Sequence, residues 1–313
     1  MGRRNLLLCF DAFGTLFKPK YPVPEQYAAV ARQCGLDGFS VAQLETSFKA
    51  AFKGESRAHP NYGKASGMGA EKWWTNVIHK TFQPLAGPGR VLPKELAPRL
   101  LHRFASDEGY ALAAGVQPLL RTLKRRQSHA AHSCRVVVGV ITNSDDRVPN
   151  ILSSLGFHVS PLRFGSPFNA AAIAGKQYDI DLHCMSYDVG FAKPDRRIFE
   201  AAEAMAEKVV AMQRGSDLLP GTGSQQQENS SWLRLYVGDE FKTDVIGARA
   251  TGWNSVLTGP EAGDQAGLLN LGQLGAAMLE DVFPQGRIPP VAIRVETVEE
   301  LLEWLIQQYE RNS

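Results

Sequence analysis

The chain has 313 residues, 44% of them hydrophobic and 21% charged, and its formal net charge is +2. This balance argues against a nucleic-acid or membrane partner, and no apolar run reaches the roughly 18 residues of a membrane span. Four widely spaced cysteines form no CxxC pair, which argues against a zinc site or disulfide framework and favours a reducing, intracellular compartment. We expect a cytoplasmic protein, with the nucleus as the alternative, and the oligomeric state is left open. A small basic cluster, Lys124–Arg126, is expected at the solvated end of a helix.

The first element is the apolar run LLLCF, which begins at Leu6 and is closed by Asp11. A short apolar run that ends in a turn signal is typical of a strand buried on both faces of a parallel sheet. Asp11 would then lie at the carboxyl end of this strand, where ligands gather in open α/β sheets. By itself, this position fits a capping residue as well as a catalytic acid.

A series of helical patterns follows, with apolar residues at three- and four-residue spacing. They cover Glu25–Cys34, Val41–Phe52, Glu71–Phe82 and Lys94–Phe104. Because no strand pattern interrupts them, we expect an all-helical insertion over residues 21–114.

From Val116 the chain alternates between helical and strand patterns. This alternation predicts an α/β fold with a Rossmann-like parallel sheet flanked by helices. Residues 1–20 and 115–313 would form this core, and residues 21–114 an inserted helical cap. The polar, low-complexity stretch over residues 215–231 is expected to be a mobile loop insertion within the core.

Polar residues follow four of the predicted strands: Asp11, Thr142, Lys193, and the pair Asp239 and Asp244. These strand ends meet at one edge of a parallel sheet. Clustered carboxylates require a cation, and oxygen ligands without histidine or cysteine suit Mg²⁺. A lysine, a hydroxyl and backbone N–H groups opposite that cation would hold a phosphoryl group.

The order of these motifs resembles the haloacid dehalogenase superfamily of hydrolases. The matching segments are FDAFGTL from Phe10, ITN from Ile141, GFAKPDRRIF from Gly190 and VGDEFKTDVIGARATGW from Val237. A helical insertion after the first motif matches members with an α-helical cap. The segment HPNYG from His59, followed by EKWW and KTF, is similar to the subfamily of haloacid dehalogenase-like hydrolase domain-containing protein three.

The resemblance implies a catalytic role for three residues. Asp11 would be the nucleophile, Thr142 would bind the transferring group, and Lys193 would stabilise the developing charge. Asn143 and Gly14 would contact the substrate phosphate.

The resemblance also implies a metal site. Asp11, the backbone carbonyl of Phe13 and Asp239 would hold Mg²⁺, and Asp244 would be a further ligand or a support.

Phe13 departs from the phosphatase pattern, in which a second aspartate at this position protonates the leaving alcohol. A positioned general acid contributes roughly 10²- to 10⁴-fold, so we expect slow hydrolysis of ordinary phosphomonoesters. His59 and Tyr62 of the predicted cap are alternative proton donors. In the dehalogenase branch an aromatic residue occupies this position, but that branch lacks the Gly-Asp pair present here at Gly238-Asp239.

Three functions follow from this mixed pattern. The interpretation we favour is Mg²⁺-dependent phosphoryl hydrolysis of a small phosphorylated metabolite, with impaired general-acid catalysis. The alternatives are a metal-independent hydrolase of the haloacid dehalogenase type and a non-catalytic regulatory or binding member of the fold.

Overall fold

The computed structural model describes residues 5–87, 89–129, 135–167, 173, 175–215, 232–259, 268–275, 277–284 and 286–311. Apart from Gly215, the predicted loop over residues 215–231 lies outside this range. The chain divides into two compact units. Unit 1 comprises Met1–Phe17, Leu112–Asn143 and Phe157–Ser313, and unit 2 comprises Lys18–Ala111 and Ser144–Gly156. Within the described ranges, no helix is both long and apolar enough to cross a membrane.

Unit 1 is built on a seven-stranded sheet with the order β5-β4-β1-β6-β7-β9-β8. All its described strand pairs are parallel, which confirms the predicted α/β fold. Strand β1 is buried along its whole length, as its continuous apolar run predicts. The strands are β1 (Asn5–Phe10), β4 (Val136–Thr142), β5 (Leu182–Met185), β6 (Trp232–Gly238), β7 (Asn254–Thr258), β8 (Leu269–Asn270) and β9 (Ala292–Val295).

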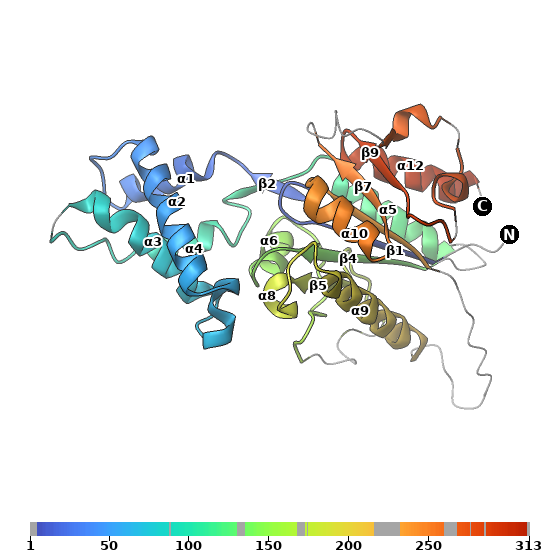
Figure 1. The fold of residues 1–313 in the computed structure, drawn as a ribbon, viewed down its shortest axis with the longest axis horizontal. Helices are drawn as coiled ribbons and strands as arrows, with labels where there is room; N and C mark the ends of the chain where they lie inside the picture. Colours follow the sequence, from blue (N-terminus) through green and yellow to red (C-terminus); the bar gives the residue numbers. More distant parts are fainter. Residues whose placement is uncertain are drawn as a thin grey trace. The chain divides into compact units, whose positions relative to one another are not determined.

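Helices cover both faces of this sheet (Figure 1). Helix α9 (Arg196–Gly215) packs on one face through a core that includes Leu7, Cys9 and Tyr236. Helices α5 (Val116–His129) and α12 (Val298–Arg311) pack against each other on the other face. The shorter elements are α8 (Ser186–Val189), α10 (Ile246–Ala250), η4 (Leu271–Gln273) and α11 (Leu279–Val282).

Unit 2 contains the four helices expected from the periodic patterns, with somewhat different bounds. The helices are α1 (Val23–Gln33), α2 (Val41–Ala58), α3 (Ala70–Ala86) and α4 (Leu96–Arg103), with the 3₁₀ segment η1 (Asn61–Ser66) before α3. Ser40 and Gln43 form a capping box at the start of α2, which explains why the helix begins there. Helix α6 (Val148–Ser154), which follows β4 in sequence, groups with this unit.

Some elements differ from the expectation. The helical segment after β6 is not one regular helix but a π turn, η2 (Phe241–Val245), followed by the short helix α10. The strands β2 (Phe17–Pro19) and β3 (Tyr110–Leu112), which pair with each other, were not predicted, nor was the edge strand β8. These three strands have only two or three residues each, too few to show a periodic pattern.

Candidate active site

The strand register of unit 1 brings the predicted site residues together. Phe10 of β1 lies beside Val140 of β4 and Val237 of β6, so Asp11 follows a position shared by all three strands. The backbone N–H of Asp11 donates to the carbonyl of Val237 over 2.8 Å. Carboxylate oxygens of Asp11, Asp239 and Asp244 all lie within 4.8 Å of one another.

Lys193 is the buried cation of this cluster, with 5% of its surface exposed. Its Nζ lies 3.0 Å from Oδ1 of Asp11 and 2.7 Å from Oδ1 of Asp244. Burial alone would lower the pKa of Lys193, but the attraction of Asp11 and Asp244 outweighs it and raises this pKa. Lys193 is therefore a charged ammonium group beside the predicted nucleophile.

Tyr236 is the third polar partner of the Lys193 ammonium group, after Asp11 and Asp244. Lys193 Nζ donates to the Tyr236 hydroxyl over 2.7 Å, and that hydroxyl donates to the backbone carbonyl of Ile141 over 2.8 Å. The sequence analysis missed Tyr236. A tyrosine in the buried second half of a strand is a signal that could have found it, because a buried hydroxyl requires a partner.

Asn143 fixes the backbone of Lys193. Its amide Nδ2 donates to the Lys193 carbonyl over 3.0 Å, and its Oδ1 accepts from the Lys193 N–H over 2.6 Å. Both ends of the amide are thus used to position the lysine. The predicted contact of Asn143 with a substrate phosphate stays a prediction.

Gly14 allows the close approach of Asp239. It has a φ of +83°, and a Cβ atom added there would lie 2.1 Å from Oδ2 of Asp239. The hydroxyl of Thr15, a second residue that the sequence analysis missed, donates to Oδ1 of Asp239 over 3.1 Å. Glycine is therefore required at position 14 both by conformation and by space, and this requirement is independent of its predicted contact with phosphate.

The pKa values of two of these carboxylates, Asp11 and Asp239, are raised. Burial raises the pKa of Asp11, opposed by Lys193 and reinforced by Asp244, while Thr142 lowers it through a hydrogen bond. Burial and the charge of Asp11 raise the pKa of Asp239 to about 6. Three carboxylates around a single ammonium leave an excess of negative charge. The donor set consists of oxygens, so it fits a hard divalent cation such as Mg²⁺.

The comparisons with known proteins agree with this arrangement. The model of the haloacid dehalogenase-like hydrolases matches residues 6–212, about two thirds of the chain. The chain belongs to the haloacid dehalogenase-like hydrolase family. As a family member it is a hydrolase, and the matched residues include the first three of the four motif segments.

Named relatives support the family and its subfamily. A hydrolase of Schizosaccharomyces pombe is 30% identical over 249 residues, covering 80% of this chain and 88% of the relative. Human haloacid dehalogenase-like hydrolase domain-containing protein 3 is 29% identical over 261 residues, covering 82% of this chain and 84% of that protein. The predicted similarity to the subfamily of protein 3 is thereby confirmed.

A solved structure supports the fold. The 2-haloacid dehalogenase from Pseudomonas syringae pv. Tomato DC3000 matches with a TM-score of 0.50 and 18% identity. The match covers 97% of this chain and 99% of that chain. At this identity, the similarity extends to the fold alone.

Phe13 gives the site of this hydrolase its unusual feature. Its ring is partly buried and packs edge-on against Phe17, with ring centroids 4.8 Å apart. An aromatic ring has no proton to give to a leaving group. The loop after β1 therefore has no acidic side chain at position 13, and the effect of this on catalysis stays a prediction.

The alternative donors lie in unit 2. Tyr62 packs against Trp73 and Trp74, and burial raises its pKa far above that of a free tyrosine. A phenol with a raised pKa is a weak acid at neutral pH, which argues against Tyr62 as a general acid. The carbonyl of His59 accepts from the indole of Trp73 over 3.0 Å, so its backbone has a structural role.

Proposed function

We propose that this protein is a Mg²⁺-dependent phosphoryl hydrolase of small metabolites with activated leaving groups, and that Asp11 is its nucleophile. The observation that carries the proposal is the cluster of three buried residues, Asp11, Lys193 and Asp244, with the half-buried Asp239 at one edge of the sheet. It combines a nucleophile, a fixed positive charge and a set of acidic ligands suited to a cation.

The proposed reaction has two steps. The Asp11 carboxylate attacks phosphorus and the bond to the leaving group breaks, which gives an aspartyl phosphate. Water then attacks this phosphate, releasing inorganic phosphate and restoring the carboxylate. The Lys193 ammonium and the Thr142 hydroxyl would stabilise charge on the transferring group.

Mg²⁺ would be held by Asp11, Asp239 and the Phe13 carbonyl, and would neutralise charge on the phosphoryl oxygens. Asp244 is better suited to support than to direct ligation. Its Oδ1 accepts from Lys193, and its Oδ2 accepts from the backbone N–H of Glu240 over 2.9 Å. Both oxygens thus already have donors, and the residue holds the lysine in place.

Phe13 restricts the substrates to those whose leaving group needs no proton. Acyl and aryl phosphates release a weakly basic anion, whereas alkyl phosphates release a strongly basic alkoxide. Because no acid at position 13 protonates that alkoxide, we expect acetyl phosphate and p-nitrophenyl phosphate to be hydrolysed faster than sugar phosphates.

Phosphate release from these compounds tests the proposal. We expect turnover with Mg²⁺, none with a chelator, and a loss of about 10⁴-fold or more in Asp11→Asn. Asp37→Asn, an exposed aspartate in unit 2, is the matched control and should retain wild-type activity.

Two results would contradict the proposal. Halide release from 2-chloropropionate without metal would instead support the dehalogenase function. Mg²⁺ binding without phosphate release from any compound would support a non-catalytic binding protein.

A further inference from the structure

Lys193 has three hydrogen-bond acceptors, and one of them is neutral. Its Nζ lies 3.0 Å from Oδ1 of Asp11, 2.7 Å from Oδ1 of Asp244 and 2.7 Å from the hydroxyl of Tyr236. An ammonium group has three N–H donors and no acceptor. The three donors of Lys193 thus meet three acceptors, and all three define where the ammonium lies.

The proton of the Tyr236 hydroxyl is already used. The hydroxyl donates to the backbone carbonyl of Ile141 over 2.8 Å, so it meets Lys193 as an acceptor. Burial and the charges of nearby acids raise the pKa of Tyr236, so this group stays a neutral phenol. A neutral acceptor holds the ammonium without cancelling its charge, as a third carboxylate would. One hydroxyl thus links Lys193 to β4, one residue before Thr142.

The ring of Tyr236 is held in place by packing. It is fully buried on β6, and residue 236 pairs in register with Cys9 of β1, two positions before Asp11. The ring packs edge-on against Phe199 of α9, with ring centroids 5.2 Å apart. Because the sheet and α9 enclose the ring, the hydroxyl is a fixed point near the carboxyl end of β1.

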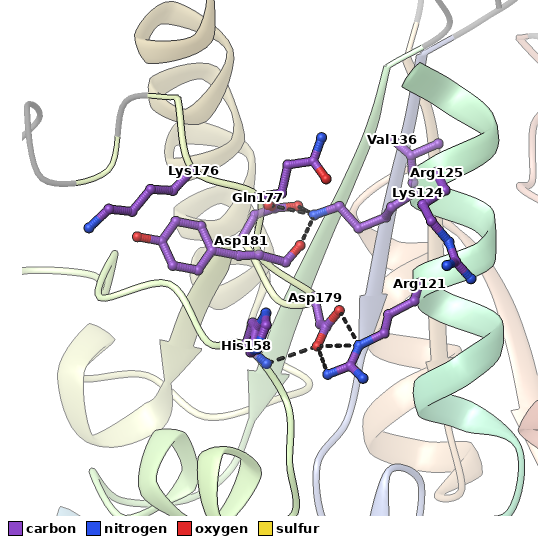
Figure 2. Close-up of a pocket in the computed structure, with 10 residues that line it drawn as sticks. Arg121, Lys124, Arg125, Val136, His158, Lys176, Gln177, Asp179 and Asp181 are labelled. Carbon is purple, nitrogen blue, oxygen red and sulfur yellow. Dashed lines mark hydrogen bonds and ion pairs between the residues drawn. The ribbon is translucent and has the colours of Figure 1, made fainter. Parts of the chain in front are cut away.

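Lys124, which lines a pocket at the opposite edge of the sheet, provides a comparison (Figure 2). Its Nζ donates to both oxygens of Asp181, each over 2.6 Å, and to the backbone carbonyl of Tyr178. Asp181 directly precedes β5, so this pair lies at the amino edge of the sheet. The neutral acceptor of Lys124 is a backbone atom that any residue provides, whereas that of Lys193 is a side-chain hydroxyl.

We propose that Tyr236 is a positioning residue for Lys193, and that its hydroxyl keeps one N–H of the ammonium directed at Asp11 during the reaction. This inference rests on the proposed hydrolase function. When Asp11 forms the aspartyl phosphate, the ammonium keeps Asp244 and Tyr236 as fixed acceptors, and its third N–H remains directed at the transferring group. Donors fixed in this way stabilise the charge of the transition state without reorganising. The hydroxyl should therefore contribute to kcat and not to substrate binding.

Hydrolysis of acetyl phosphate by Tyr236→Phe in the presence of Mg²⁺ tests this proposal. The variant removes the hydroxyl and keeps the ring, whose centroid is 5.2 Å from Nζ of Lys193. We expect kcat to fall ~10- to 100-fold and KM to change by less than ~2-fold. Tyr27→Phe is the matched control, because Tyr27 is a buried tyrosine of unit 2, and it should leave kcat unchanged. Urea unfolding verifies that both variants are folded.

A double-mutant cycle with Lys193→Met separates positioning of the lysine from support of the Ile141 carbonyl. If the hydroxyl acts through Lys193, Tyr236→Phe should change kcat by less than ~2-fold once the lysine is absent. An equal loss with and without the lysine would overturn the proposal, because the hydroxyl would then act through Ile141.

Three further results would overturn the role of Tyr236. They are a wild-type kcat in Tyr236→Phe, a raised KM with unchanged kcat, and an equal loss of kcat in Tyr27→Phe. Each of them requires a wild type that releases phosphate, so the proposed hydrolase function would stand. A wild type that releases no phosphate from any compound would instead overturn the proposed function, and the role of Tyr236 with it.

Discussion

The two edges of the sheet in unit 1 differ in the number of cations that lie beside their carboxylates. At the carboxyl edge, Asp11, Asp239 and Asp244 surround Lys193, so acids outnumber the cation. At the amino edge, Asp179 pairs with Arg121, and Asp181 pairs with Lys124. The number of cations per acid distinguishes the candidate metal site at the carboxyl edge from the two structural ion pairs at the amino edge.

The pKa values report part of this difference. Burial raises the pKa of Asp181 and Lys124 lowers it, and the charge of the neighbouring Asp179 is the smallest of the named causes. The pKa of Asp239 is raised by burial and by its acidic neighbour Asp11 together. A buried acid is therefore a candidate metal ligand when its neighbours are other acids, and a structural residue when its neighbour is a cation.

The largest expected effect comes from adding an acid to the carboxyl edge. Phe13→Asp should speed the hydrolysis of alkyl phosphates by about 10²- to 10⁴-fold, because a carboxylic acid at this position could protonate the leaving alkoxide. The hydrolysis of acetyl phosphate should change much less, since its leaving group needs no proton. The kcat for each substrate with Mg²⁺ measures the effect.

Phe13→Leu is the control for this substitution, because it also removes the ring contact with Phe17 but introduces no acid. An equal gain in Phe13→Leu would show that space at the site, rather than proton transfer, limits the rate.

The next largest effect concerns the amino edge. Asp181→Asn should lower the unfolding free energy by about 3 kcal/mol, because it leaves the Lys124 ammonium in a poorly hydrated place without its charge partner. The side chains of Lys124 and Asp181 are 16% and 7% exposed. Urea unfolding at pH 7 measures the change.

Glu45→Gln is the matched control for Asp181→Asn. It breaks the pair with Lys49 on the surface of α2, and should cost less than about 0.5 kcal/mol. Similar losses in the two variants would mean that the pair at the amino edge contributes no more than a surface ion pair.

The smallest expected effect has the opposite sign. In metal-free protein, Asp239→Asn should raise the unfolding free energy by about 1–2 kcal/mol at pH 7, because it removes a charge that burial and Asp11 disfavour. The folded pKa of Asp239 is about 6, above the ordinary value of 3.8. As the pH rises between these values, the unfolded chain loses its proton first, so the wild type loses stability.

The gain from Asp239→Asn should therefore vanish near pH 4 and be complete above pH 6. Urea unfolding across this range, with a chelator present, measures it. A loss of stability in Asp239→Asn at pH 7 would show that the carboxylates are compensated without a metal ion.

Much of the carboxyl edge could be predicted because its signals are local. The run LLLCF marks a buried strand by itself, and an acid directly after it must lie at the end of that strand. Parallel strand order then brings Asp11, Thr142 and Asp239 to one edge whatever the details of packing. The proposed roles of these residues in catalysis remain predictions for the experiments above.

Other features depend on contacts between distant segments. Tyr236 binds Lys193, 43 positions away, and Arg121 binds Asp179 across 58 positions. The spacing of these residues along the chain does not show which partner each of them contacts.

The sequence by itself thus determined the longer strands, their polar ends and the missing acid at Phe13, because periodicity and residue type express these directly. Only the tertiary structure decided which partner each buried charge meets: Lys193 among several acids, and Lys124 with Asp181. The physical reason is that burial makes the energy of a charge depend on the few groups within hydrogen-bonding distance, and packing selects those groups.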